Sequence, residues 1–510
     1  MAEFEKLISI DLQYQYLKED ITTVKKDFKS YLFEALYLIQ QYYGLNKFID
    51  IIFTIIEFIQ LMAFPMDKVF NKTWGDTWVK IVGNFFRFFQ LTCLWNRTSF
   101  YIISYIISCI YIIVLISMFL NIMIKSNALN SNIIIKAIII MLQLFNIFSI
   151  PCLRKLFSIF TCQNDAVEIS QEIKCKSIIH IILIIISIVF IIIFTFFEIL
   201  FHSTIYEFGY NSNILKSGYS SSTNVVLDIV KLLLIILYQF ISHEIVLSII
   251  TLILSIIILI HFIIIQPYST EFTMKLYLIL YIHFCWSCII CIISIFLRNS
   301  KFKSGIVLLI LGYPFILVLL YLKGDDYTIE KLLFYILYSK NNEYNIIINI
   351  EYFLKLSDNL SEKIKSKQYK LLFTYIMDHE NKCTEKNCYI KMFLQIPFEI
   401  KNFENLKVLL LQHADILYKN AISKHPFNLK LRLSYILFLI KRMNKKLKAK
   451  NELLILNKFE KNLECSFITY KLQKYLNENE QNKKLDINNN YSGSISYKLI
   501  SNRIKSSIII

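Results

Sequence analysis

The sequence predicts an all-α protein: a polytopic transmembrane helical bundle followed by a cytosolic antiparallel helical array. Of its 510 residues, 56% are hydrophobic, which is too apolar for an ordinary soluble protein and typical of the membrane class. Long apolar runs at residues 178–201 and 244–267 reach the roughly 20 residues that an α-helix needs to cross a hydrocarbon core. The chain has only 9 glycines and 6 prolines, which favours long helices and disfavours sheets with tight turns.

Residues 1–44 are expected to form a cytosolic or interfacial helical lead-in. They are mixed and charged, without a basic stretch followed by an apolar one, so we expect no cleavable signal peptide. Residues 30–44 carry an aromatic and leucine face. That face could lie on the membrane surface or pack on a partner helix, and packing is the interpretation that we favour.

Residues 45–322 are predicted to form the transmembrane domain, with about eight spans. Each expected span is an apolar run long enough, or nearly so, to cross the hydrocarbon core, and polar segments separate the runs. The spans are expected at residues 48–66, 100–124, 132–152, 177–201, 225–241, 244–266, 276–297 and 304–322.

Two pairs of polar residues stand out inside these spans. Glu57 and Gln60 lie one turn apart on one helix face, and Glu198 and His202 have the i, i+4 spacing at which helical side chains meet. Ionisable groups inside a membrane cost about 2.5–3.5 kcal/mol on insertion scales and usually face protein or a cavity. With Asp228, these residues are candidates for an ion path. The alternatives are interhelical hydrogen bonding for the first pair and termination of the span at the headgroups for the second.

The distribution of lysine and arginine gives no consistent orientation. Arg154, Lys155, Lys174 and Lys176 lie between the expected third and fourth spans, which places that loop in the cytosol by the positive-inside rule. Carried along the chain, the rule puts the C-terminal domain outside. A lysine-rich domain with several free thiols is more typical of the cytosol, so we expect it there. Either one span is then miscounted, with residues 225–241 and 312–314 as the candidates, or the rule fails for this chain. The sequence does not indicate which membrane holds the chain.

Residues 323–477 are predicted to form a soluble domain of repeat-like helices. Further helices are expected at residues 429–443, 447–459 and 466–476, and together they resemble tetratricopeptide-type pairs. Residues 478–510 are rich in Asn, Ser and Lys and are expected to be disordered. The first clear amphipathic stripe, at spacings of three and four before the helix-ending Pro426, consists of Leu406, Leu410, His413, Leu417 and Ala421.

A polar loop before these helices carries a candidate zinc site. His379, Cys383 and Cys388 follow the pattern H-x3-C-x4-C, and imidazole and thiolate are the ligands that zinc prefers. A structural site needs four ligands, and His413 is the nearest fourth. The alternative is a loop with two free thiols or one labile disulfide.

The cysteines inside the expected spans are interpreted as small hydrophobic side chains; they are Cys109, Cys152, Cys285, Cys288 and Cys291. Cys285, Cys288 and Cys291 recur every three residues inside an apolar span, where packing is favoured over metal binding. The 11 cysteines of the chain have no regular spacing, so we expect no disulfide framework of the secreted type.

The sequence carries no catalytic motif that we can identify. It has no nucleotide-binding P-loop, zinc-protease helix, nucleophile elbow or kinase motif set, so we expect no enzyme and no cofactor apart from that zinc. Selectivity-filter and voltage-sensor patterns are also missing from the sequence. The net charge of +17 suits anionic lipid headgroups. No recognisable nucleic-acid fold accompanies it, so we expect lipid and not nucleic acid as a partner.

Several short stretches match a known family. They are IIEFIQLMAFPM with Trp74 and Trp78 downstream, FSIPCLRKLFSIFTC around Pro151 and Cys162, DHENKCTEKNC, and a C-terminal segment. Over about residues 45–475 the chain resembles the ciliate multi-pass membrane proteins related to the tiny macrocysts proteins TmcB and TmcC of social amoebae. The C-terminal segment carries the fullest match, at Tyr418, Ala421, Pro426, Arg432, Tyr435, Phe438 and Leu439.

The resemblance implies a multi-span region followed by cytosolic tetratricopeptide-like repeats. In that family a PAS-type sensory module and further spans commonly follow the repeats. This chain ends soon after them, so it is expected to be a short paralogue or an incomplete gene model that lacks the module. The resemblance therefore brings no sensory role to this chain.

The expected function is that of a non-enzymatic integral membrane protein. Its cytosolic helical repeats would bind a protein partner in membrane signalling or scaffolding. The alternative is an ion or small-solute transporter or channel that uses the intramembrane polar residues.

Overall fold

The computed structural model describes most of the apolar half of the chain and a C-terminal set of helices. The described residues are 28–42, 47–70, 74, 83–89, 98–125, 132–163, 166–167, 170–204, 206–208, 217–218, 220–265, 267–268, 271–297, 308–314, 347, 350, 354 and 403–478.

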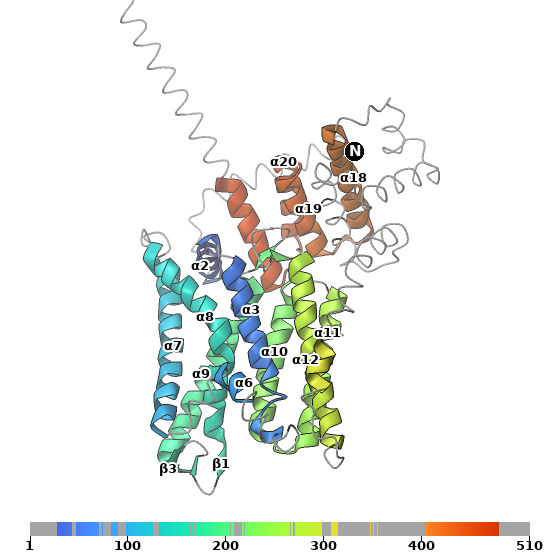
Figure 1. Cartoon of the computed structure of the whole chain (residues 1–510). Helices are drawn as coiled ribbons and strands as arrows, with labels where there is room; N and C mark the ends of the chain where they lie inside the picture. The colour runs from blue at the N-terminus through green and yellow to red at the C-terminus, as the bar shows by residue number, and fades with distance from the viewer. Residues whose placement is uncertain are drawn as a thin grey trace, which may run out of the picture.

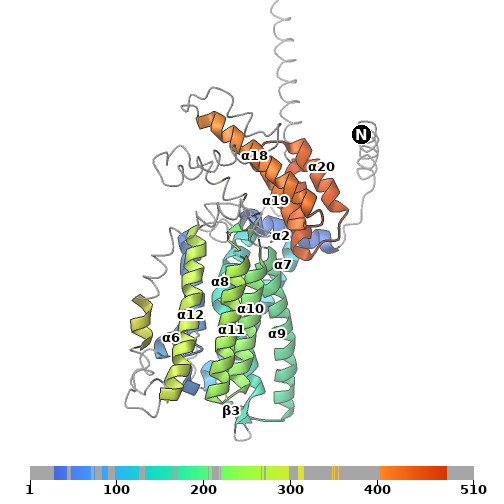
Figure 2. The same ribbon diagram turned by 90° about the vertical axis from the view of Figure 1, so that its right-hand side faces the viewer.

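A bundle of long helices forms the larger part of the described structure (Figures 1 and 2). Helix α10 packs against α8, α9 and α11, and α11 packs against α12. We call these helices, with α3 and α7, the bundle. They are α3 (Lys47–Met62), α7 (Thr98–Lys125), α8 (Asn132–Phe157), α9 (Ile178–Thr204), α10 (Ser222–Phe240), α11 (Glu244–Ile265) and α12 (Glu271–Leu297).

Four of the described helices are long and apolar enough to cross a membrane. They coincide with four of the expected spans, including the one that contains Asp228 and Lys231. Their outward faces are lined by exposed isoleucines such as Ile182, Ile192 and Ile264, an arrangement that suits lipid better than water. The four are Ile178–Thr204, Ser222–Phe240, Glu244–Ile265 and Phe272–Leu297.

Helix α3 is shorter than the span expected at residues 48–66. It has 16 residues, a length of about 24 Å at the α-helical rise, because the chain turns after Met62 and then enters a short 3-10 helix, η1 (Lys68–Phe70). Trp74 Nε1 donates a hydrogen bond to the carbonyl oxygen of Pro65 at 2.9 Å. Next along the chain comes α6 (Asn84–Phe89), which packs on α3.

The expected span at residues 304–322 is described only over residues 308–314, which are helical. This segment approaches α12 closely at Gly312, where an added Cβ would come within 2.3 Å of the Trp286 ring. The Trp286 indole donates to the carbonyl oxygen of Leu309 at 3.4 Å. A glycine is therefore required for this contact.

Two small sheets interrupt the helices, although the sequence disfavoured tight-turn sheets. Strands β1 (Cys162–Gln163), β2 (Ala166–Val167) and β3 (Ser170–Lys174) pair antiparallel between α8 and α9. Strands β4 (Glu207–Phe208) and β5 (Ser217–Gly218) pair in parallel between α9 and α10.

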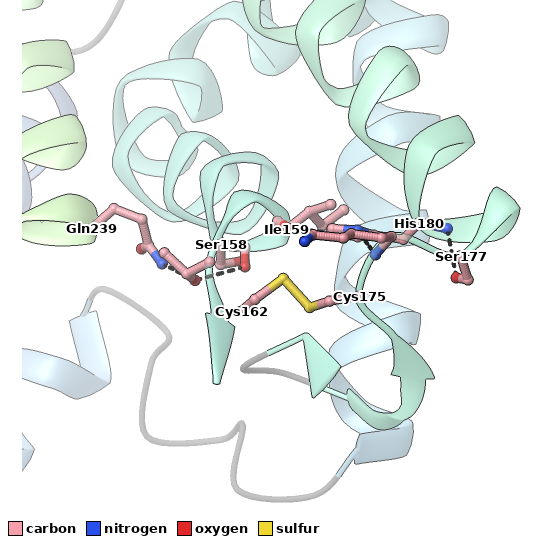
Figure 3. The surroundings of a disulfide bond; sticks show 9 residues. Ser158, Ile159, Cys162, Cys175, Ser177, His180 and Gln239 are labelled. Carbon is pink, nitrogen blue, oxygen red and sulfur yellow. Dashed lines mark hydrogen bonds between the residues drawn. A yellow bond between two sulfur atoms is a disulfide. The ribbon is translucent and has the colours of Figure 1, made fainter. Parts of the chain in front are cut away.

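A disulfide joins Cys162 to Cys175 across the antiparallel sheet (Figure 3). This finding adds a cross-link to a chain in which the sequence indicated no disulfide framework. The adjoining first turn of α9 is fixed to the end of α8, because His180 Nε2 lies 2.9 Å from the carbonyl oxygen of Ile159. Of the cysteines that were interpreted as small hydrophobic side chains, Cys109 is free and half-buried. The others are free and buried: Cys152, Cys285, Cys288 and Cys291.

Helix α2 (Phe28–Tyr42) packs on α7 and α8, as favoured for the lead-in. Its Phe33 ring meets Phe467 edge-on at a centroid distance of 5.6 Å. The aromatic face of the lead-in is therefore covered by protein.

The C-terminal unit, residues 403–478, is a set of helices at the end of the bundle opposite β1 and β3 (Figure 1). It contains α18 (Phe403–Lys424), α19 (Leu429–Lys441), α20 (Lys446–Asn457) and a last helix over residues 463–478. Asn428 caps α19 by accepting a hydrogen bond from Leu431 N at 3.0 Å. Every residue from 431 to 440 is buried, so α19 is enclosed on all sides. The tetratricopeptide character of this unit stays a prediction.

The C-terminal unit contacts the connection between α9 and α10 through Glu464. The Glu464 carboxylate accepts hydrogen bonds from Tyr206 Oη at 2.5 Å and from Ser221 N at 3.1 Å. Lys430 pairs with the same carboxylate at 3.1 Å. The last helix also reaches α2, where Glu34 accepts a hydrogen bond from Tyr470 and pairs with Lys474. Of the expected disordered tail, residues 479–510 lie outside the described residues.

Candidate functional site

Five ionisable side chains from three helices converge inside the bundle. Glu57 comes from α3, Glu198 and His202 come from the C-terminal end of α9, and Asp228 and Lys231 come from α10. We call these five residues the charge cluster. The sequence separation between α3 and α10 exceeds 150 residues, so this meeting is a product of the fold.

Lys231 lies at the centre of the charge cluster. Its ammonium pairs with the Glu57 carboxylate and lies 3.1 Å from Asp228 Oδ1 and 4.0 Å from Glu198 Oε1. The Lys231 residue is 1% exposed. A lysine is almost never buried to this degree unless it is paired, and here the pairing involves three carboxylates.

Asp228 connects the lysine to a histidine. Its second oxygen, Oδ2, lies 2.5 Å from His202 Nδ1, while Oδ1 accepts from Lys231. The i, i+3 spacing places Asp228 and Lys231 on one face of α10. Asp228 is thereby held in a fixed orientation by two partners from two helices.

Glu198 is the least satisfied member of the charge cluster. The residue is 1% exposed, and its Oε1 has no hydrogen-bond partner within the described part of the chain. The Lys231 ammonium, 4.0 Å from that oxygen, is too far for a hydrogen bond.

The charge cluster carries more negative than positive charge. Three carboxylates, Glu57, Glu198 and Asp228, face one ammonium, so with a neutral His202 the formal sum is −3 + 1 = −2. Burying an uncompensated charge costs several kcal/mol even after relaxation. The arrangement therefore favours the uptake of positive charge between these residues.

Gln60 lies on the same helix as Glu57 but takes no part in these ion pairs. Its amide donates to the carbonyl oxygens of Phe89 at 2.9 Å and Ile147 at 2.7 Å. The structure thus separates the pair that the sequence grouped together, and gives Gln60 the interhelical role named as the alternative. Glu198 is enclosed by protein, at 1% exposure; whether its helix ends at the headgroups stays a prediction.

The candidate zinc ligands His379, Cys383 and Cys388 lie outside the described residues, and so does the side chain of His413. Two other groups of potential ligand atoms occur in the described part. One combines Cys162, Cys175 and His180, but its two sulfurs are joined in the disulfide. The other consists of Glu198, His202 and Asp228, whose donor atoms all lie within 4.8 Å of one another.

Lys231 is the member of the charge cluster that sequence reasoning did not place in the site. The i, i+3 spacing from Asp228 is the signal that could have found it, because an oppositely charged pair at that spacing is typical of a buried ion pair inside an apolar helix.

A second charged group lies in the C-terminal unit. Asp415 accepts a hydrogen bond from Tyr435 Oη at 2.7 Å and pairs with Lys419 at 2.7 Å and Lys448 at 3.6 Å. Burial alone would raise the pKa of the Asp415 carboxyl, but the hydrogen bonds from Lys419 and Tyr435 outweigh it, and the pKa lies below its ordinary value.

Comparisons with known proteins found no matching family model, no similar curated protein and no similar solved structure. The resemblance to the tiny macrocysts-related family stays a prediction. The argument about function therefore depends on the geometry of this chain.

Proposed function

We propose that this chain is an integral membrane protein that moves cations through its helix bundle by way of the charge cluster. The observation that supports this function is the excess of buried carboxylates: three of them share one ammonium. A site with excess negative charge attracts cations and repels anions. The proposal adopts the transporter or channel alternative and treats the charge cluster as a cation-binding site along the route through the bundle.

The location of the charge cluster fits this proposal. Glu198 lies six residues before the end of α9 and Asp228 six residues after the start of α10, which corresponds to a depth of about 9 Å from that end of the bundle. Polar groups this deep among apolar helices are expected to serve an ion path.

The test is a flux measurement with the purified full chain in liposomes. We expect uptake of at least one cation from a panel of protons, Na⁺, K⁺, Ca²⁺ and Zn²⁺, and at least a tenfold loss of that uptake in Glu198→Gln. Asp415→Asn, which changes a carboxylate far from the bundle, is the control and should retain the flux. Uptake no faster than in empty liposomes for the whole panel would overturn the proposal, as would equal uptake by Glu198→Gln.

The same proposal places the C-terminal unit in the cytosol. A disulfide persists in oxidising compartments outside the cytosol, so the end of the bundle that holds Cys162 and Cys175 would face that side. The C-terminal unit lies at the other end (Figure 1). This orientation agrees with the expectation for a lysine-rich domain, but opposes the positive-inside reading of residues 154–176.

Two basic residues near the end of α8 support the proposed orientation. Arg154 pairs with Asp67 at 2.7 Å and Lys155 is 2% exposed, so both charges are held within the protein instead of facing headgroups. A glycosylation acceptor inserted after Gln163 should receive a glycan during membrane insertion, and one inserted after Met443 should not. The reverse pattern would contradict the orientation.

A second candidate function is the binding of a cytosolic protein by the C-terminal unit. The supporting observation is the exposure of Phe427, on the turn between α18 and α19, and of Leu447, in the first turn of α20; each is 77% exposed. If they are binding residues, Phe427→Ser combined with Leu447→Ser in the full chain should abolish cross-linking to a partner while leaving cation flux intact. Unchanged cross-linking would count against this role.

A further inference from the structure

We propose that Glu198, His202 and Asp228 form a binding site for one divalent transition-metal cation, of the zinc, cobalt or manganese class. This inference rests on the proposed function and names the class of cation for which the charge cluster is suited. The metal would lie between α9 and α10, with Lys231 beside it.

The geometry provides three ligand atoms at one place. The His202 imidazole nitrogen and one oxygen each from Glu198 and Asp228 lie within 4.8 Å of one another. Two ligands at a metal–ligand distance of about 2.1 Å lie roughly 3–4 Å apart, so small side-chain adjustments would bring all three to one ion. Glu198 and His202 share a face of α9 through their i, i+4 spacing, and Asp228 approaches from α10.

An independent observation at Glu198 points to a missing ligand. Its Oε1 is buried and has no hydrogen-bond partner among the described residues, although a buried carboxylate oxygen normally has one. The Glu198 carboxylate belongs to the group in which Asp228 and His202 already face each other at 2.5 Å. A cation bound to all three would satisfy it.

The donor types select the class of cation. Imidazole nitrogen with carboxylate oxygens suits divalent transition metals, whereas calcium and magnesium prefer sites made of oxygens alone. In the form that binds a metal, with all three carboxylates ionised and His202 neutral, the formal charge of −2 equals the charge that one divalent ion neutralises. A monovalent ion would leave half of the excess uncompensated.

Lys231 is a positioning residue for this site. It holds Asp228 Oδ1 at 3.1 Å, which leaves Oδ2 directed toward His202, in the way that outer partners orient metal ligands. Its positive charge also repels a bound cation and so weakens binding. Weakened binding is what a site on a transport path requires, since the ion must leave again.

Binding of Co²⁺ to the purified full chain in detergent is the test, followed by the visible absorption of the bound ion and by titration calorimetry. We expect one Co²⁺ per chain, displaced by Zn²⁺ but not by Ca²⁺. We expect the affinity to fall at least tenfold in Glu198→Gln and in His202→Gln. His261→Gln is the matched control, because His261 is a bundle histidine that contacts Thr223 outside the charge cluster, and it should bind as the wild type does.

Three results would overturn the site: no Co²⁺ bound by the wild type, equal binding by both ligand variants, or displacement by Ca²⁺ as readily as by Zn²⁺. A ligand variant counts only if its thermal unfolding in metal-free buffer matches that of His261→Gln, and either variant alone suffices. The two proposals fail separately. Flux of a monovalent cation without Co²⁺ binding ends this inference alone, and Co²⁺ binding without any flux ends the transport proposal alone.

Discussion

The charge cluster of the bundle and the group around Asp415 in the C-terminal unit use the same side-chain types in opposite proportions. Three carboxylates surround Lys231 in the bundle, whereas two lysines flank one carboxylate in the C-terminal unit. The lysine side chains differ most in exposure: 1% for Lys231 against 51% for Lys419 and 38% for Lys448.

The difference shows that the energetic cost of a surplus charge depends on whether the charge is exposed or buried. Water screens and solvates the surplus lysine in the C-terminal unit, so that surplus has little energetic consequence. The surplus carboxylates of the bundle are enclosed by protein, where desolvation is costly. Of the two groups, only the charge cluster of the bundle therefore favours the binding of a counter-ion.

The largest expected effect comes from Lys231→Met. Removal of the ammonium leaves three carboxylates buried without a counter-ion among them, and breaking a buried ion pair in this way costs about 3–5 kcal/mol. We expect that loss in the free energy of unfolding of the full chain, measured in mixed detergent with EDTA present. Lys448→Met is the control, with an expected change within about 0.5 kcal/mol. Equal losses for the two variants would remove the distinction between the clusters.

Glu57→Gln should have a smaller effect of the same sign. Glu57 pairs directly with Lys231, and hydrogen bonds to a charged group are worth about 1.5–3 kcal/mol. The amide keeps the shape and can still accept a bond, so we expect a loss toward the lower end of that range. The same unfolding measurement checks it, and a gain in stability would show that Glu57 is not the principal partner of Lys231.

Tyr435→Phe should destabilise the C-terminal unit by about 1–2 kcal/mol, because it removes the hydroxyl that donates to Asp415.

The lowered pKa of Asp415 also gives its interactions a definite pH dependence. Their contribution is complete above the unfolded-state pKa of about 3.9 and disappears as the pH falls through the lower folded-state pKa. The free energy of unfolding of the full chain, measured by calorimetry, should therefore fall less steeply with decreasing pH in Asp415→Asn than in the wild type. Parallel acid profiles would contradict the role given to Asp415.

Glu198→Gln should change stability least, by about 1 kcal/mol or less in either direction. The substitution removes one of the surplus charges and preserves side-chain volume, and Glu198 Oε1 has no hydrogen bond to lose. Measured without metal, this variant should unfold close to the wild type even though it loses flux and metal binding. A loss as large as that of Lys231→Met would make Glu198 a structural partner instead of a ligand.

The sequence was sufficient to predict the helical class and several long helices, because the length of an apolar run can be compared directly with the thickness of a hydrocarbon core. It also singled out Glu57, Glu198, His202 and Asp228, since an ionisable group is conspicuous inside such a run. It could not show that they meet, because the rotation and neighbours of α3, α9 and α10 are set by packing. For the same reason Gln60 was grouped with Glu57, although its amide turns to Phe89 and Ile147.

The disulfide escaped prediction for a different reason. Cys162 and Cys175 lie in a short polar connection, and their pairing depends on the strand register between β1 and β3, which no hydrophobic pattern reveals. The orientation stays a prediction, because a residue count cannot tell a lysine that faces headgroups from one that is enclosed by protein, as Lys155 is.

Helix α9 is fixed at its first turn and carries two of the proposed metal ligands near its other end. The disulfide and the His180 contact hold its first turn to the end of α8, while His202 lies 24 residues further on than Ile178, an arm of about 36 Å. A pivot of about 5° at the tethered end displaces the far end by about 3 Å, which is more than a metal–ligand bond length of about 2.1 Å. A small rotation about the cross-linked end would therefore move Glu198 and His202 on α9 relative to Asp228 on α10 by more than a metal–ligand bond length.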